Sequence, residues 1–166
     1  MVWPPPTTVR WFRAHLTGRT QSVCINGALS DPEAILYGVP QGSILGPLMF
    51  IMYINDLTTV VKLCKVHLYA DDTLLYFDSS SVQDIETSLS KDLENIVGWL
   101  NQNFLILNHS KTKIMLMGTS QKLNQMSSFT VTINNATLEC VHKFRYLGVT
   151  LDPNLSWNEN SDHPPN

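Results

Sequence analysis

Cysteine is scarce in this sequence, and its spacing excludes two kinds of site. The chain of 166 residues contains only Cys24, Cys64 and Cys140. An odd number of cysteines lying far apart does not suit a disulfide framework or a zinc site, because both use closely spaced pairs. The pattern is typical of a protein that works in a reducing compartment inside the cell.

Long apolar runs are also missing, which excludes a helical membrane protein. The most apolar stretch, residues 48–54, is far shorter than the roughly 20 residues that a membrane-spanning helix needs. The opening residues 1–10, MVWPPPTTVR, lack the apolar centre of a signal peptide. We therefore expect no membrane partner and an intracellular location, in the cytoplasm or the nucleus.

A strong excess of charge is lacking as well. Lys and Arg number 11 against 14 Asp and Glu, which gives a formal net charge of -3 and no overall electrostatic reason to expect nucleic-acid binding. The beginning of the chain is nevertheless basic, because no acid precedes Asp31 whereas Arg10, Arg13 and Arg19 do. The 43% hydrophobic content is enough for the core of one domain.

The early part of the sequence predicts a hairpin, a loop and a helix. Asn26–Gly27 predicts a tight turn, because this dipeptide tolerates positive φ. Residues 37–47 are rich in Gly and Pro and read as a loop, after which Pro47 suits the first position of a helix that runs to about Asp56. That helix is apolar on nearly all sides, so we expect it to be buried.

The later part predicts strands around one amphipathic helix. Residues 62–69 and 73–77 are strand-like and meet at a turn formed by residues 70–72. From Ser81 to about Leu100, apolar residues recur at helical spacing, so this helix should pack on a sheet. The fold class predicted is α+β. Further strands are predicted at residues 104–108, 111–118, 129–141 and 144–152, with Asn134 and Asn135 turning a hairpin.

Two neighbouring acids, Asp71 and Asp72, stand in the stretch HLYADDTLLYF at residues 67–77. One interpretation is ordinary turn chemistry, because Asp side chains bond nearby backbone N–H groups and tolerate tight turns. The other is a metal site, because Mg²⁺ prefers one or two carboxylates together with phosphate oxygens and water. Both interpretations stay open at this point.

Strand alternation bears on the metal interpretation. If it continues through the turn, His67, Tyr69 and Asp71 lie on one face of the sheet and Asp72 lies on the other. The small Ala70 would then leave room for a ligand beside Asp71. Two magnesium ions about 3.5 to 4 Å apart can activate a 3′ hydroxyl and stabilise a leaving pyrophosphate, and paired acids at a hairpin tip suit that chemistry.

These residues carry a resemblance to a known family. The sequence YADD, residues 69–72, matches the Tyr-x-Asp-Asp motif of reverse transcriptases, and GVPQGSILGPLMFIMYINDL, residues 38–57, resembles the loop and helix that precede this motif in non-LTR (LINE-type) retrotransposon enzymes. Several blocks in one order are more specific than any single motif. The resemblance predicts a partial reverse transcriptase domain over residues 11–157, with residues 1–10 and 158–166 as tails outside it. The further similar blocks are residues 11–23, 107–118 and 144–152.

The resemblance implies a part of the polymerase palm, an antiparallel sheet with the Asp-Asp hairpin, backed by helices. The family copies an RNA template onto a DNA primer from deoxynucleotides and uses two Mg²⁺ ions. By resemblance Asp71 is a palm metal ligand with Asp72 as its neighbour, and Tyr69 lines the primer end. By resemblance Gln41 and Gly42 lie on the loop that faces the template and the incoming nucleotide, and the weaker alternative is a plain loop that leads into a helix.

Two lysines are implied in a further role. Lys111 and Lys113 belong to the block that approaches the triphosphate in the family, where an ammonium could offset the charge of the leaving group. A solvated strand edge explains these lysines equally well. By resemblance residues 144–152 support the primer, but a plain sheet strand is an equal alternative.

The resemblance also predicts what the chain lacks. In the family the first metal-binding Asp lies upstream of the block that begins at Trp11, and no acid precedes Asp31 here. Fingers and thumb are expected to be lacking as well. We therefore expect a polymerase fragment that is inactive alone and binds a single Mg²⁺ weakly, unless another fragment of the parent element supplies the missing palm strand. The alternative is a noncatalytic relic that at most binds nucleic acid or another protein.

Overall fold

The computed structural model describes residues 5–40, 42–125, 129–157 and 160. The chain divides into two compact units, Met1–Ile54 and Asn55–Asn166. Both units mix helices with short strands, so the predicted α+β class is confirmed at this level.

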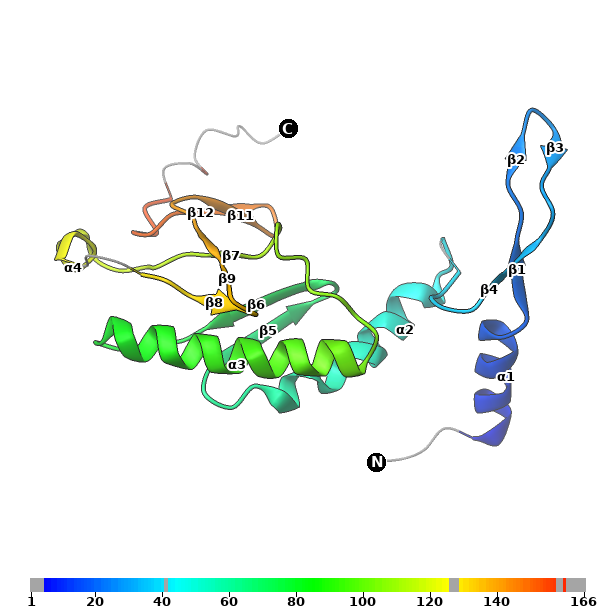
Figure 1. The fold of residues 1–166 in the computed structure, drawn as a ribbon, viewed down its shortest axis with the longest axis horizontal. Helices are drawn as coiled ribbons and strands as arrows, with labels where there is room; N and C mark the ends of the chain where they lie inside the picture. Colours follow the sequence, from blue (N-terminus) through cyan, green and yellow to red (C-terminus); the bar gives the residue numbers. More distant parts are fainter. Residues whose placement is uncertain (1–4, 41, 126–128, 158–159, 161–166) are drawn as a thin grey trace. The chain divides into compact units, whose positions relative to one another are not determined.

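The first unit begins with a helix that the sequence pattern did not indicate. Helix α1, Pro6–Leu16, has a proline in its first turn, where a missing N–H costs nothing. A two-stranded ribbon follows, in which β1 pairs with β4 at its base and β2 with β3 at its tip (Figure 1). The bounds of its strands are β1 Arg19–Gln21, β2 Cys24–Ile25, β3 Ala28–Leu29 and β4 Glu33–Ile35.

The tip of this ribbon confirms the predicted hairpin. Ile25 pairs with Ala28, which leaves Asn26 and Gly27 as the two turn residues, with φ of 51° and 82°. A turn with positive φ at both positions is the one that Asn-Gly favours.

Helix α2, Leu45–Ile54, begins earlier than predicted. The hydroxyl oxygen of Ser43 accepts hydrogen bonds from the backbone N–H groups of Leu45 and Gly46, each at 3.2 Å, so Ser43 caps the helix and Pro47 falls inside its first turn. The expected burial was wrong for much of this helix: Ile54 at its end is buried, but several of the other apolar side chains are about half-exposed or more. They include Leu48 at 49%, Ile51 at 50% and Met52 at 63% exposure.

The second unit is organised by helix α3, Val82–Gln102, which confirms the helix predicted from residue 81. Its N-cap is Ser81, whose hydroxyl accepts a hydrogen bond from the N–H of Asp84. The remaining elements of this unit are the 3-10 helix η1 Asn55–Val60, helix α4 Ser120–Gln125 and the strands β5 Lys65–Tyr69, β6 Asp72–Tyr76, β7 Lys113–Ile114, β8 Thr132–Ile133, β9 Ala136–Thr137, β10 Glu139–Cys140, β11 Phe144–Tyr146 and β12 Val149–Leu151.

The main core of this unit lies between α3 and the β8–β9 hairpin (Figure 1). The hairpin turns at Asn134 and Asn135, both with positive φ, as predicted. Its side chains Val131 and Ile133 are 0% and 1% exposed. The other members of the core are Val97, Ile114 and Leu138, with Leu89, Leu93, Leu107 and Phe129 packed against them.

The strand predicted at residues 104–108 was wrong, because the end of α3 uses part of that run. Phe104 adopts a φ of 54°, and the N–H of Leu105 donates to the carbonyl oxygen of Leu100 at 2.8 Å. This is the hydrogen bonding of a Schellman ending, in which a left-handed residue terminates the helix. The following Ile106 is 93% exposed and belongs to no strand.

Two other predicted strands are also corrected. Residues 111–118 reduce to the short β7, and residues 144–152 form a hairpin because Leu147 and Gly148 turn the chain with φ of 47° and 86°. The described strands form six separate two-stranded sheets, of which β7–β10 is parallel, instead of one antiparallel sheet. Most of the strands contain only two or three residues, too few to build a wide sheet.

Candidate functional site at the Asp71–Asp72 hairpin

Strands β5 and β6 form an antiparallel hairpin that carries both acids. Tyr69 pairs with Asp72, which leaves a two-residue turn of Ala70 and Asp71. Directly paired residues point to the same face of a sheet. The prediction that Asp72 lies on the opposite face from Tyr69 was therefore wrong, since the turn is shorter than the three residues expected.

The turn stores some backbone strain. Ala70 has a φ of 51°, a left-handed conformation that a residue with a Cβ adopts at a cost of roughly 1 to 2 kcal/mol. Asp71 and Asp72 are both exposed, and Tyr69 is 64% exposed beside them. The hairpin thus presents two carboxylates and an aromatic ring to solvent at one end.

The exposed face of the hairpin carries an ordered row of side chains. The rings of His67 and Tyr76 stack with centroids 5.5 Å apart, and His67 Nε2 lies 3.2 Å from the Tyr76 hydroxyl. The ammonium of Lys65 lies 5.7 Å from the Tyr76 ring centre and 3.4 Å from Asp78 Oδ1. These contacts hold the base of the hairpin and leave the carboxylates at its tip without a cationic partner among the described residues.

The donor set at the tip consists of two carboxylates, those of Asp71 and Asp72. Carboxylate oxygens are what Mg²⁺ prefers, and it keeps several waters when a protein supplies only one or two of them. Over the described part of the chain, no cluster of three or more His, Cys, Asp or Glu side chains could hold a metal. The third carboxylate that a two-ion site needs is thus not found beside Asp71 and Asp72 within those residues.

The loop residues assigned by resemblance belong to the first unit. Gln41 lies outside the described residues. Gly42 is exposed and has a φ of 76°, and a Cβ built there meets nothing within 4 Å. The backbone conformation, and not lack of space, is what favours glycine at this position.

The two candidate lysines differ in their surroundings. Lys113 lies in β7, and its ammonium forms a salt bridge with Glu139 of the paired strand β10. Lys111 is exposed, and within the described residues no salt bridge to it is found. No hydrogen bond or ion pair of the described chain joins either lysine to the hairpin.

Sequence reasoning missed a buried acid close to the hairpin. Asp92 on α3 is 0% exposed, and its carboxylate accepts hydrogen bonds from the backbone N–H groups of Lys62 at 3.0 and 3.1 Å, Leu63 at 2.7 Å and Cys64 at 2.7 Å. Asn95 Nδ2 donates a further one at 3.3 Å. A signal was present, because Asp92 stands seven positions after Ile85 and seven before Trp99, on the apolar stripe of the helix.

The buried carboxylate and its neighbouring thiol shift each other's pKa. Burial acts to raise the pKa of Asp92, but the N–H donors of Cys64, Lys62 and Leu63 outweigh it and lower that pKa. For Cys64, burial first and the nearby Asp92 charge second raise the pKa of the thiol to about 12. The carboxylate is therefore held ionised and the thiol held neutral.

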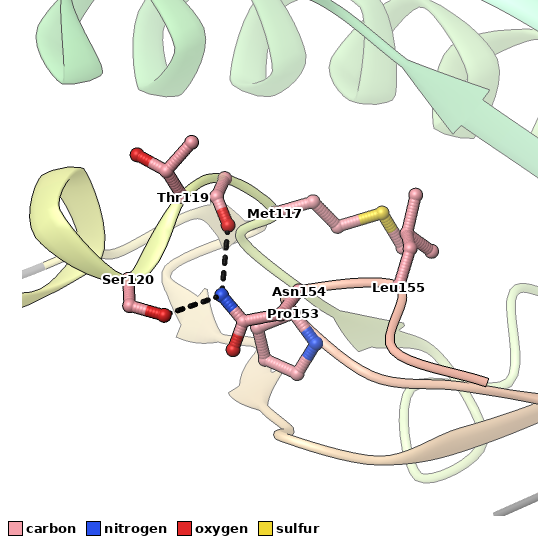
Figure 2. A pocket seen from close by; sticks show the side chains of 7 residues that line it. Met117, Thr119, Ser120, Pro153, Asn154 and Leu155 are labelled. Carbon is pink, nitrogen blue, oxygen red and sulfur yellow. Dashed lines mark hydrogen bonds between the residues drawn. The ribbon is translucent and has the colours of Figure 1, made fainter. Parts of the chain in front are cut away.

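A shallow hollow of about 490 Å³ lies elsewhere in the second unit. Figure 2 shows Asn154 at its centre, where Nδ2 donates to the carbonyl oxygen of Gly118 at 3.0 Å and to the hydroxyl of Ser120 at 3.2 Å. None of the residues that line it has a titratable side chain. These residues are Met117, Gly118, Thr119, Ser120, Pro153, Asn154 and Leu155.

The family model described as reverse transcriptase (RNA-dependent DNA polymerase) matches residues 3–151. The chain belongs to the reverse transcriptase family. The match includes the hairpin with Asp71 and Asp72, and it also includes both candidate lysines. The predicted domain bounds of 11–157, which begin and end later than the matched residues, stay a prediction.

Curated relatives in this family come from insect mobile elements. The chain is 27% identical over 162 residues to the RNA-directed DNA polymerase from mobile element jockey of Drosophila melanogaster, which covers 93% of this chain and 17% of the relative. It is also 27% identical over 153 residues to the probable RNA-directed DNA polymerase from transposon BS of the same species, with 88% and 17% covered. A retrovirus-related Pol polyprotein from a type-1 retrotransposable element R1 of Nasonia vitripennis is 26% identical over 129 residues, with 74% and 31% covered.

The chain thus spans about a sixth of the length of the first relatives it matches. The relatives support the non-LTR retrotransposon origin predicted from the motifs. No solved structure matches the chain at a significant level. Within the described residues, no helix combines the length and apolar character that crossing a bilayer requires.

Proposed function

We propose that this chain supplies the acidic palm hairpin of an RNA-directed DNA polymerase from a non-LTR retrotransposon. The observation that carries the proposal is the exposed turn in which Asp71 follows Tyr69 by two residues and Asp72 pairs directly with Tyr69, in a chain that belongs to the reverse transcriptase family. RNA template, DNA primer and deoxynucleotides are the substrates that this function requires.

Three residues of the hairpin, together with Lys111 outside it, suit distinct parts of nucleotidyl transfer. Asp71 and Asp72 would hold one Mg²⁺ ion, which when bound helps to activate a primer 3′ hydroxyl or to stabilise the leaving pyrophosphate. The exposed ring of Tyr69 offers a stacking surface for a base at the primer end. Lys111 is exposed and offers a charge that can offset the triphosphate.

The loop of the first unit has a separate proposed part. Gly42 keeps its backbone open to a close approach, because no side chain stands between the peptide groups and a ligand. We assign Gly42 a contact with the template and the incoming nucleotide, and the same role stays a prediction for Gln41, which lies outside the described residues. This placement follows from the family resemblance of residues 38–57.

The small number of carboxylates at the hairpin tip leads us to propose that the 166-residue chain does not extend a primer by itself. Two magnesium ions carry four positive charges, and a bridging third carboxylate is needed to hold them together. The described residues contain no such cluster. A further carboxylate, supplied by another fragment of the parent element, would complete the site.

Primer extension and metal binding together test this proposal. The wild-type chain and Asp71→Asn are titrated with Mg²⁺ by calorimetry and are incubated with a primed RNA template, deoxynucleotides and Mg²⁺. We expect weak Mg²⁺ binding, in the millimolar range or poorer, that the variant loses, and no extension by either protein. Extension by the wild-type chain alone would overturn the proposed inactivity, and equal Mg²⁺ binding by both proteins would return the acids to ordinary turn chemistry.

A further inference from the structure

The hairpin is attached to α3 at both of its ends. On the incoming side, the Asp92 carboxylate binds the N–H groups of residues 62–64, immediately before β5 begins at Lys65. On the outgoing side, the chain after β6 passes into Ser81, the N-cap of the same helix. A two-stranded hairpin is marginal in water by itself, so these attachments decide where it lies.

The incoming attachment is unusually strong for an irregular segment. Residues 62–64 belong to no helix or strand, yet one ionised carboxylate accepts all three of their N–H groups. Two of the N···O distances are 2.7 Å, in the short range of charge-assisted hydrogen bonds. Three successive N–H groups that converge on an anion form a nest, which holds the chain in one conformation.

We propose that Asp92 is a positioning residue for the Asp71–Asp72 turn. By engaging the N–H groups of residues 62–64, it ends the pairing of β5 at Lys65 and so determines the register of the hairpin. A register slip of one residue would move Asp72 to the opposite face of the sheet. The metal part of this inference rests on the proposed function, whereas the positioning part rests on the hydrogen bonds alone.

The position of the turn then follows from the rigidity of the strand. The five residues of β5 lie between Cys64, the last residue bound by Asp92, and Ala70, a span of about 20 Å at the rise of a β-strand. Asp92 therefore acts on the carboxylates from a distance and has no direct contact with them among the described hydrogen bonds. A carboxylate that only stabilised the second unit would leave the turn unchanged when replaced in a protein that still folds.

Paramagnetic broadening by Mn²⁺, read by NMR on the full chain, separates these two roles. The probe is Mn²⁺ titrated against wild type, Asp92→Asn and the control Glu94→Gln, which removes a charge from an exposed position of the same helix. We expect the amides of Asp71 and Asp72 to broaden in wild type and in the control. Asp92→Asn should need about tenfold more Mn²⁺ for the same broadening, as is common when a group that orients metal ligands is lost.

Hydrogen exchange supplies a readout that does not depend on metal. In Asp92→Asn we expect faster exchange of the amides of residues 62–64 and of β5 and β6, while the core amides of Val131 and Ile133 keep wild-type chemical shifts. An unchanged Mn²⁺ midpoint together with unchanged exchange in β5 and β6 would overturn the positioning role. Broadening at neither acid in wild type would instead count against the proposed function, and exchange in the hairpin would still decide the role of Asp92.

If Asp92→Asn does not fold, hydrogen exchange of the wild-type chain alone still tests the inference. The amides of residues 62–64 should then exchange about as slowly as those of the core strand β8, although they belong to no regular element. Rapid exchange of these three amides in the folded wild-type chain would show that the carboxylate does not hold them, and the inference would fail.

Discussion

Tyr69 and Asp72 face each other as the last cross-strand pair of the β5–β6 hairpin. Only Ala70 and Asp71 remain to form the turn, so Asp71 stands at its tip and Asp72 lies beside the exposed Tyr69 ring. The two acids therefore occupy different environments although they are neighbours in the chain. Substitutions at either one should have separable effects.

Asp71→Asn should remove the weak Mg²⁺ binding and leave the fold almost intact. The side chain is exposed, and its replacement relieves repulsion with Asp72, so the free energy of unfolding should change by less than about 0.5 kcal/mol. Calorimetric Mg²⁺ titration and urea unfolding measure the two quantities. Asp78→Asn is the matched control, because it removes an exposed acid of the same region that pairs with Lys65. Equal loss of Mg²⁺ binding in the control would contradict an assignment to the turn.

Two substitutions of Ala70 should affect the stability of the fold differently. Ala70→Gly removes the strain of a φ of 51° but makes the unfolded chain more flexible, so stability should stay equal or rise by up to about 1 kcal/mol. Ala70→Val places a branched side chain in the same conformation and should lower stability by about 1 to 2 kcal/mol. Thermal or urea unfolding measures both. Thr73→Gly, at an ordinary position of β6, should destabilise and serves as control.

Local signals explain why parts of the fold could be predicted. The turn at Asn26–Gly27 and the start of α3 at Ser81 are decided by residues that lie within a few positions of one another. The hairpin with Asp71 could be predicted for the same reason. The resemblance of YADD to the family motif then suggested a role for its two acids. These features depend on backbone conformation and capping, which short stretches of sequence determine.

Other parts depend on partners that are distant in the chain. The predicted strand at residues 62–69 begins only at Lys65, because Asp92, about 30 residues later, takes the N–H groups that a strand would use. The apolar run that starts at Phe104 looks like a strand, but its first residues close the end of α3. Asp72 lies on the same face of the hairpin as Tyr69 because the turn contains only two residues. The alternation of side chains along the strands does not reveal the length of the turn.

Acid should weaken the second unit through Asp92. Its pKa is lowered in the folded chain from an ordinary value of 3.8, so ionised Asp92 stabilises the fold above that pH, and the contribution is lost as the pH falls through the lowered folded pKa. Asp92→Asn should lower the free energy of unfolding by about 2 to 3 kcal/mol at pH 7. Urea unfolding of both proteins at pH 7, 5 and 3 measures the difference.

The difference between the two proteins should shrink at acid pH. The pKa of Asp152 is also lowered, mainly by the Ser156 hydroxyl that bonds to it, but both proteins contain this residue. Its contribution therefore cancels in the comparison. A stability difference that stays constant from pH 7 to pH 3 would show that the Asp92 charge is not what stabilises the fold.

The three thiols should react at different rates. Cys24 and Cys140 are exposed, whereas burial and the Asp92 charge raise the pKa of the Cys64 thiol to about 12, so almost no thiolate forms there at pH 8. Iodoacetamide should label Cys24 and Cys140 first and Cys64 only slowly, as mass spectrometry of each peptide would show. Unfolding in urea should equalise the rates. A Cys64 that is labelled as fast as Cys24 in the folded chain would contradict its protected environment.

Lys111 should contribute more to triphosphate binding than Lys113. The ammonium of Lys113 already pairs with Glu139, whereas Lys111 is exposed and has no salt bridge within the described residues. Loss of an exposed charge that meets a phosphate is worth about 0.5 to 1 kcal/mol, so Lys111→Ala should weaken binding of a deoxynucleoside triphosphate with Mg²⁺ about two- to fivefold. Lys113→Ala and the control Lys91→Ala, on exposed α3 surface, should change it less.

Salt separates an electrostatic contribution of Lys111 from a structural one. At an ionic strength near 1 M the Debye length falls to about 3 Å, so an exposed ammonium is screened and the difference between wild type and Lys111→Ala should largely disappear. A loss of folding would instead persist in high salt and would appear in circular dichroism. Fluorescence titration with a labelled deoxynucleotide at low and high salt measures the effect. If Lys113→Ala weakens binding more than Lys111→Ala, the pair with Glu139 must open to meet the phosphate, and the order proposed for the two lysines is wrong.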